Sequence, residues 1–240
     1  MTGSQAAGGP VIPSFGRPSQ CLKDNGWFCT DWIRSHWGDI LQPALIQHIE
    51  LTVIAVSIGF GIAFLLALVG FRFRLFDAPL GAFTDFLYTI PSLAFFLLLV
   101  PLTGVTVTTI EIALISYTLF VFYRNIVEGL RGVPADVLES ARGMGLTRRQ
   151  TFWRVELPLA VPAILAGVRV ATVSTISIAT VGAFLLYYGL GGPIFDALSM
   201  PDIFHTELLA ASGLAVLLAL TADTLLALLQ RALTPWNRLG

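Results

Sequence analysis

The sequence predicts an all-α integral membrane protein. Of its 240 residues 55% are hydrophobic and 12% are charged, about half the charged fraction usual in soluble domains. The mean hydropathy is +0.79, and the apolar residues come in runs of about 20, the length at which a helix crosses a bilayer. Helices are expected because an open sheet leaves backbone groups unsatisfied in lipid. The net charge of −1 gives nucleic-acid binding no electrostatic support.

Five apolar runs are predicted to span the membrane. They lie at about residues 44–70, 83–102, 107–123, 159–186 and 208–229. The third run is short and is interrupted by Glu111. We expect these five helices to form one transmembrane domain over residues 44–231, followed by a cytoplasmic tail, 232–240.

Basic residues predict the orientation of the spans. Ten arginines fall on one side of the membrane if the N-terminus is outside and the C-terminus is in the cytoplasm. These are Arg72, Arg74, Arg124, Arg131, Arg142, Arg148, Arg149, Arg154, Arg231 and Arg238. The opposite loops, around Thr103 and over residues 187–207, carry no Lys or Arg. Arg17, Lys23 and Arg34 of the N-terminal segment do not follow the pattern.

The N-terminal segment divides into two predicted parts. Residues 1–26 form a Gly-, Pro- and Ser-rich flexible tail without the pattern of a signal peptide. Residues 27–43 predict an amphipathic helix with three tryptophans, which we expect at the membrane interface rather than simply packed on neighbouring helices. Cys21 and Cys29 precede the first span. A disulfide and two free thiols are both consistent with the sequence, and no Cys/His cluster has metal-ligand spacing.

Charged residues within the spans need partners or water, because a bare charge in the bilayer is costly. Arg169 lies near the middle of the fourth run and Asp223 in the inner half of the fifth. We expect these two residues to form an ion pair. Glu50, Asp85 and Glu111 lie nearer the ends of their runs, so we expect them to reach the headgroups.

The basic loop 124–158 contains the stretch ESARGMGLTRRQTFWRVELP. Its pattern predicts two short helices joined at Gly145, the first started by an Asp136 cap. Neither helix has enough apolar surface to bury alone. Two interpretations are equally open from the residues: docking to a partner protein, or attachment to anionic lipid.

A resemblance favours the first interpretation. Glu139-Ser-Ala141, Gly145 and Leu157-Pro158 are spaced as in the EAA signature of permease subunits of type I bacterial ABC importers, with Ser140 and Val155 as close replacements. The resemblance implies that the loop carries a coupling helix docked on a separate ATPase. It also implies contact or shaping roles for a set of loop residues: Glu139, Ser140, Ala141, Gly145, Leu146, Leu157 and Pro158.

Four further stretches, 88–104, 123–145, 156–173 and 187–198, resemble the osmoprotectant branch of these permeases. This resemblance implies import of glycine betaine, carnitine, choline or proline betaine across the bacterial cytoplasmic membrane. Its implied partners are two ATPase chains, an identical or second permease, and an extracytoplasmic substrate-binding protein. The sequence departs from the family pattern near the bulky Phe184–Tyr188 segment, and we expect Tyr187 and Tyr188 to pack there or to guide the solute at the outer mouth.

The chain itself lacks the residues for ATP hydrolysis. No phosphate-binding GxxxxGK[ST] loop and no catalytic Ser/His/Asp or Cys/His set occurs. We therefore expect no enzymatic activity, with ATP and Mg²⁺ bound by the partner. The alternatives are a permease for another small solute such as methionine, a secondary transporter with Glu50, Glu111 or Asp223 as an ion site, and a membrane scaffold.

Overall fold

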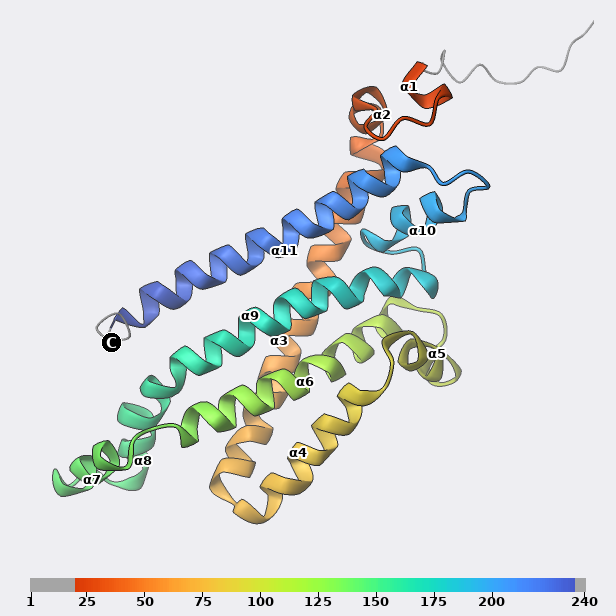
Figure 1. The fold of residues 1–240 in the computed structure, drawn as a ribbon. Coiled ribbons are helices and arrows are strands. Elements are labelled where there is room, and N and C mark those ends of the chain that lie inside the picture. Colours follow the sequence, from red (N-terminus) through yellow and green to blue (C-terminus); the bar gives the residue numbers. More distant parts are fainter. Residues whose placement is uncertain (1–19, 236–240) are drawn as a thin grey trace, which may run out of the picture.

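The computed structural model describes residues 20–235 (Figure 1). In that part of the chain every regular element is a helix, which confirms the predicted all-α class. The predicted tails at 1–26 and 232–240 lie largely outside the described residues, as do Arg17 and Arg238. The shorter helical elements are α1 (Gln20–Lys23), α2 (Thr30–Ser35), η1 (Trp37–Leu41), α4 (Arg74–Thr89), α5 (Ser92–Thr103), α7 (Ala135–Gly143), α8 (Arg148–Thr151), η2 (Phe152–Glu156), η3 (Gly182–Phe184) and α10 (Gly191–Ser199).

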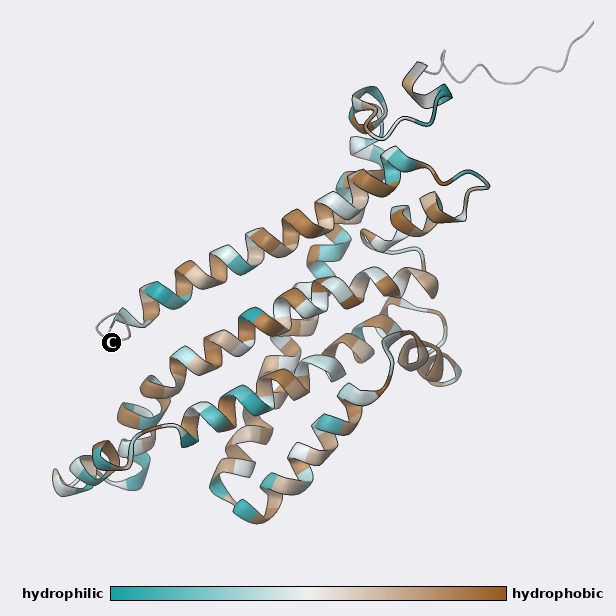
Figure 2. Ribbon diagram, viewed as in Figure 1, coloured by the Kyte–Doolittle hydropathy of each residue, from teal (hydrophilic) through white to brown (hydrophobic). Residues whose placement is uncertain are grey.

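Four long helices have the length and apolarity needed to cross a membrane, some together with the short elements that flank them. They are α3 (Gln42–Arg72), α6 (Val107–Arg131), α9 (Leu157–Val181) and α11 (His205–Leu233). Helix α6 contacts both α3 and α9, and α9 contacts α11. In Figure 1, α6, α9 and α11 run alongside one another while α3 crosses them. Figure 2 shows that hydrophobic residues dominate these helices.

The predicted second span, 83–102, is wrong as a single straight helix. Helices α4 and α5 meet at a bend of 99°. Pro91 disfavours a helical conformation at the residue before it, and Ile90 is extended with φ −70° and ψ 126°. The Tyr117 hydroxyl of α6 donates a hydrogen bond to the freed Ile90 carbonyl. The count is therefore four spans, or five if this bent pair crosses the membrane as one.

The predicted end of the third span at Tyr123 is also wrong. Helix α6 continues to Arg131, so Arg124 and Arg131 lie on the helix and not in the loop. Both arginines pair with aspartates of α4, Asp85 and Asp77. The charges of Arg124 and Arg131 lower the local hydropathy, which is why the sequence predicted a loop there. Pairing with the aspartates stabilises these charges on a helix.

Two π-helical turns accommodate prolines at the starts of long helices. The N–H of Gln42 donates to the Trp37 carbonyl, and the N–H of Leu157 donates to the Phe152 carbonyl. Each turn is followed one residue later by a proline, Pro43 or Pro158. A wider turn relieves the clash of the proline ring with the preceding turn. As a result the second loop helix is continuous with the fourth span, from Arg148 to Phe184.

The segment predicted as one interfacial helix, 27–43, consists of α2 and η1, the latter continuous with α3. Trp32 is buried and packs edge-on against Phe204. Trp27 stacks on His205 with ring centroids 4.0 Å apart, and Trp37 is 42% exposed. These contacts fix the segment to the start of α11, and its place at the membrane interface stays a prediction.

Helix α6 forms the centre of the bundle. Phe122, Tyr123 and Ile126 are fully buried in a cluster with small residues of α3 and α9, including Ala63 and Ala160. Small residues allow helices in membranes to approach closely. This packing fixes the inner ends of α6 and α9, and therefore the position of the loop between them.

Candidate functional site

The basic loop folds as a hairpin of two short helices whose turn is made by Gly145. The Leu146 N–H donates to the Ala141 carbonyl at 3.2 Å, and the Gly145 N–H donates to the Arg142 carbonyl at 2.9 Å. This pair of bonds is a Schellman motif, which ends a helix with a left-handed residue. Gly145 has φ +79°. The four-residue spacing from Ala141 to Gly145 in the predicted signature is therefore the spacing of a helix stop.

The second helix starts at once after this stop. Thr147 and Gln150 form a capping box: Gln150 Oε1 accepts from the Thr147 N–H at 2.9 Å, and Thr147 Oγ1 accepts from the Gln150 N–H at 3.4 Å. The chain then passes through the π turn to Leu157 and Pro158, which begin α9. The predicted signature residues thus mark the two ends of the segment that joins the hairpin to the membrane span.

Helix α7 presents most of its surface to solvent. Ala141 is its buried residue, while Glu139 and Ser140 are exposed and Met144 is 72% exposed. The Ser140 hydroxyl donates to the Asp136 carbonyl, so its polar group is satisfied within the helix. Pro134, and not the predicted Asp136, precedes the first residue of α7. Asp136 lies in the first turn instead, where a negative charge still favours the helix.

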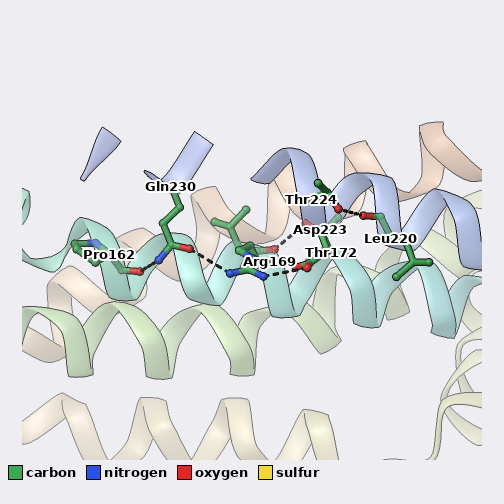
Figure 3. Close-up of polar contacts among 8 residues, drawn as sticks. Pro162, Arg169, Thr172, Leu220, Asp223, Thr224 and Gln230 are labelled. Carbon is green, nitrogen blue, oxygen red and sulfur yellow. Dashed lines mark hydrogen bonds and ion pairs between the residues drawn. The ribbon is translucent and has the colours of Figure 1, made fainter. Parts of the chain in front are cut away.

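The residues predicted to pair within the spans, Arg169 of α9 and Asp223 of α11, lie in direct contact (Figure 3). Arg169 Nε and Nη2 each lie 2.9 Å from an Asp223 carboxylate oxygen. Gln230 extends this arrangement, with its Oε1 3.5 Å from Arg169 Nη1 and its Nε2 donating to the Pro162 carbonyl at 3.0 Å. This polar ladder, Arg169, Asp223, Gln230 and Pro162, joins α9 to α11.

A second Arg–Asp pair, between α4 and α6, was not predicted. Asp85 lies eleven residues after the first residue of α4, not at a span end, and it pairs with Arg124 of α6, whose Nε donates to Asp85 Oδ1 at 3.2 Å. The expected place of Asp85 at the headgroups stays a prediction. The pair lines an open groove of about 640 Å³ along α4, α6 and α9, here called the central groove. Its other lining residues are Tyr88, Thr89, Phe120, Val121, Asn125, Glu128 and Val170.

The loop after α9 is held by His48. His48 is fully buried in α3. Its Nε2 lies 3.0 Å from the Ile176 carbonyl and its Nδ1 accepts from the Leu190 N–H at 3.2 Å. These bonds require a neutral ring protonated on Nε2. Gly191 packs so closely that a Cβ there would lie 2.2 Å from the Thr180 carbonyl oxygen.

Tyr187 and Tyr188, the predicted outer-mouth residues, differ in exposure. Tyr187 is 53% exposed, whereas Tyr188 packs against the cluster around Phe96 and Ile110. Burial raises the pKa of Tyr187, and the carboxylates of Asp196 and Glu207 raise it further. Burial likewise raises the pKa of Tyr188, so both hydroxyls are uncharged at neutral pH.

Cys21 and Cys29, for which the sequence left two interpretations open, are joined by a disulfide. The bridged segment is anchored on the start of α11. The Cys29 N–H donates to Thr206 Oγ1 at 3.2 Å, and Asn25 Nδ2 donates to the Ile203 carbonyl at 2.8 Å. These long-range contacts carry no sequence signal, because each depends on one polar side chain, Thr206 or Asn25, meeting a distant backbone group.

The helical bundle, the paired charges inside its spans and the exposed basic hairpin define an integral membrane transport component. The family model of the binding-protein-dependent transport system inner membrane component matches residues 59–238, and the chain belongs to this family. The protein is thus a multi-pass bacterial membrane permease and not an enzyme.

Similar proteins agree with this assignment. The choline transport system permease protein OpuBB of Bacillus subtilis (strain 168) is 34% identical over 205 residues, covering 85% of this chain and 93% of that protein. The osmoprotectant import permease protein OsmW of Salmonella typhimurium is 34% identical over 200 residues, covering 81% and 92%. The MetNI methionine ABC transporter in an inward-facing conformation shares the fold, with a TM-score of 0.69, 18% identity, and coverage of 81% of this chain and 96% of that chain.

Proposed function

We propose that the chain is the permease subunit of an ATP-driven importer for quaternary amines of the glycine betaine, carnitine and choline class. The substrate class rests on the similarity to OpuBB and OsmW. In this proposal two ATPase chains bind ATP and Mg²⁺, a second permease, identical or different, completes the pathway, and an extracytoplasmic protein delivers the solute. The N-terminus lies outside, the C-terminus lies in the cytoplasm, and the bent α4–α5 pair counts as the fifth span.

The single observation that carries this proposal is the exposed hairpin that Gly145 closes. Helix α8 of the hairpin continues directly into α9 through the π turn, and α7 packs against α8 across the Gly145 turn, so a movement of the hairpin is transmitted to a span. Movement in a docked ATPase therefore shifts the bundle between states that differ in their contacts. Glu139, Ser140, Ala141 and Leu146 form or support the contact surface, while Leu157 and Pro158 set the start of α9.

The central groove supports a pathway shared with a second permease. Arg124 lies seven residues before the end of α6, about 10 Å into the helix from that end. Charges at that depth face protein or water and not lipid. The stacked rings of Tyr88 and Phe120, 4.4 Å apart, offer faces that attract a quaternary ammonium group.

The test compares two glycines of the hairpin. In Gly145→Ala the new side chain meets the left-handed backbone, which costs about 1 kcal/mol and shifts the hairpin turn. Gly143→Ala is the matched control, because a Cβ there contacts nothing within 4 Å. We expect Gly145→Ala to reduce both ATPase co-purification and ATP-dependent uptake of labelled choline or glycine betaine several-fold, with Gly143→Ala close to wild type.

Three outcomes would contradict the proposal. Equal behaviour of the two glycine variants would show that the hairpin turn does not matter for coupling. Labelling of a cysteine placed at Met144 from outside the cell would reverse the orientation. Uptake of methionine but not of quaternary amines would retain the permease and change its substrate.

A further inference from the structure

A second groove, of about 980 Å³, lies between the inner end of α3 and the hairpin. It is named the inner groove here. Apart from Leu146, its lining residues have no role in the transport function proposed above. Its lining residues are Leu68, Val69, Phe71, Arg72, Phe73, Arg142, Leu146, Arg148, Arg149, Thr151, Phe152 and Glu156.

The walls and the rim of the inner groove differ in chemistry. Leu68, Val69 and Phe71 come from the last turns of α3, and the Phe71 ring faces Phe152 of the π turn, with ring centroids 6.3 Å apart. The rim carries four exposed arginines, Arg72, Arg142, Arg148 and Arg149, against one carboxylate, Glu156. The groove therefore combines apolar walls with an excess of three positive charges.

In the orientation proposed above, the inner groove is expected near the cytoplasmic boundary of the bilayer. Helix α3 ends at Arg72. The neighbouring aromatic residues Phe73 and Trp153 are 52% and 54% exposed, as expected for side chains at the headgroup level. In this orientation the apolar walls are expected at the hydrocarbon edge and the arginines among the headgroups.

We propose that the inner groove binds one anionic phospholipid, with its phosphate held by the arginines and the upper part of an acyl chain against the apolar walls. Basic pockets on the cytoplasmic side of membrane proteins suit anionic headgroups, and Arg pairs well with phosphate. A soluble phosphate would leave the apolar walls uncovered. The bound lipid would link α3 to the hairpin. This site rests on the orientation given in the proposed function, but not on the proposed substrate.

The test measures lipid retention by native mass spectrometry of the purified chain in mild detergent. Phosphatidylglycerol is titrated against phosphatidylcholine with the same acyl chains. We expect phosphatidylglycerol to bind preferentially, and Arg72→Gln and Arg149→Gln each to weaken its binding about fivefold. Arg154→Gln is the matched control: it removes an exposed loop arginine outside the groove, and its retention should match wild type.

Four outcomes would overturn this site. Equal retention of the two lipids would remove the role of charge. An equal loss in Arg154→Gln would indicate nonspecific attraction to the basic loop. Displacement by millimolar inorganic phosphate would indicate a phosphate site. Loss of the lipid when the ATPase is co-purified would mean that a protein segment fills the groove. Arg72 lies on α3 and outside the hairpin. Loss of lipid in Arg72→Gln therefore cannot be caused by damage to the hairpin.

Discussion

Two of the three Arg–Asp pairs in the described helices, Arg169–Asp223 and Arg124–Asp85, have similar exposure but different surroundings. The side chains of Arg169 and Asp223 are 34% and 39% exposed, and those of Arg124 and Asp85 are 46% and 39% exposed. The first pair belongs to a ladder between two helices. The second pair lines a groove beside an acid, Glu128, and aromatic rings.

The packing around each pair explains why their roles differ. The buried residues of α11 all lie in its outer part, from Thr206 to Ala215, so the polar ladder is a principal attachment of its inner half. Helices α4 and α6 have other links. Tyr123 Oη donates to Asp77 Oδ1 at 3.0 Å, and Arg131 Nη2 lies 2.9 Å from Asp77 Oδ2. One pair therefore stabilises the bundle, while the other is free to contribute to a pathway.

Breaking the ladder should have the largest effect. Arg169→Ala and Asp223→Ala each leave one charge without its partner in the membrane. We expect a several-fold lower yield of monodisperse protein for each single variant, and a smaller loss in the double variant than the sum of the two. The measurement is a double-mutant cycle by size-exclusion chromatography.

Thr224→Ala is the control for this cycle, because the exposed Thr224 hydroxyl bonds only to the Leu220 carbonyl of its own helix. Strictly additive losses would mean that the contact between Arg169 and Asp223 contributes nothing to assembly. The stabilising role assigned to the Arg169–Asp223 pair would then be wrong.

Neutralising the groove pair should have an intermediate effect, and on transport rather than on assembly. Asp85→Asn removes the carboxylate paired with Arg124 and leaves Glu128 as the acid lining the groove, so the groove proposed for a quaternary amine becomes more positive and we expect uptake per folded molecule to fall several-fold. The contacts of Asp77 with Tyr123 and Arg131 still join α4 to α6, so the melting temperature should change little. Uptake of labelled choline at several concentrations and thermal melting check this expectation.

Asp77→Asn is the matched variant on the same helix. Asp77 joins Tyr123 and Arg131 and does not line the central groove. It should lower stability with normal uptake per folded molecule. If Asp85→Asn unfolds the protein while Asp77→Asn impairs transport, the roles assigned to the two aspartates are reversed.

The difference between the two Arg–Asp pairs also shows which features of the molecule the sequence can predict. Arg169 and Asp223 each stand within a long apolar run, so the cost of a lone charge in lipid predicts that they meet. The hairpin was predictable because helix stops and caps depend on residues that are close in the sequence. The left-handed backbone at position 145 favours glycine in any tertiary surroundings. Both predictions follow from the residue types themselves: the cost of a charge within an apolar run, and the backbone conformations open to glycine.

Arg124 and Asp85 escaped prediction because hydropathy cannot distinguish a helix carrying paired charges from a loop. Arg124 was placed just beyond the end of its apolar run, so no charge inside a span required a partner there. Sequence separation is not the cause, because Arg124 and Asp85 are 39 residues apart and the predicted pair Arg169–Asp223 is 54 residues apart. The α4–α5 bend was predictable from Pro91, which disfavours a helix at Ile90. The apolar run around it is long enough for one span, and this length favoured a single helix. The bonds of His48 to Ile176 and Leu190 had none, since they depend on tertiary packing.

Removing the outermost group of the ladder should have the smallest effect. Gln230→Ala deletes the bond to the Pro162 carbonyl and the long 3.5 Å contact to Arg169, and leaves the ion pair in place. Hydrogen bonds between membrane helices contribute about 0.6 kcal/mol each, so the melting temperature should fall by about 2 °C. Thermal melting of Gln230→Ala beside Asp223→Ala gives the ratio of the two losses. A loss as large as that of Asp223→Ala would mean that the ladder holds α11 as one cooperative unit, with Gln230 positioning the guanidinium for the carboxylate.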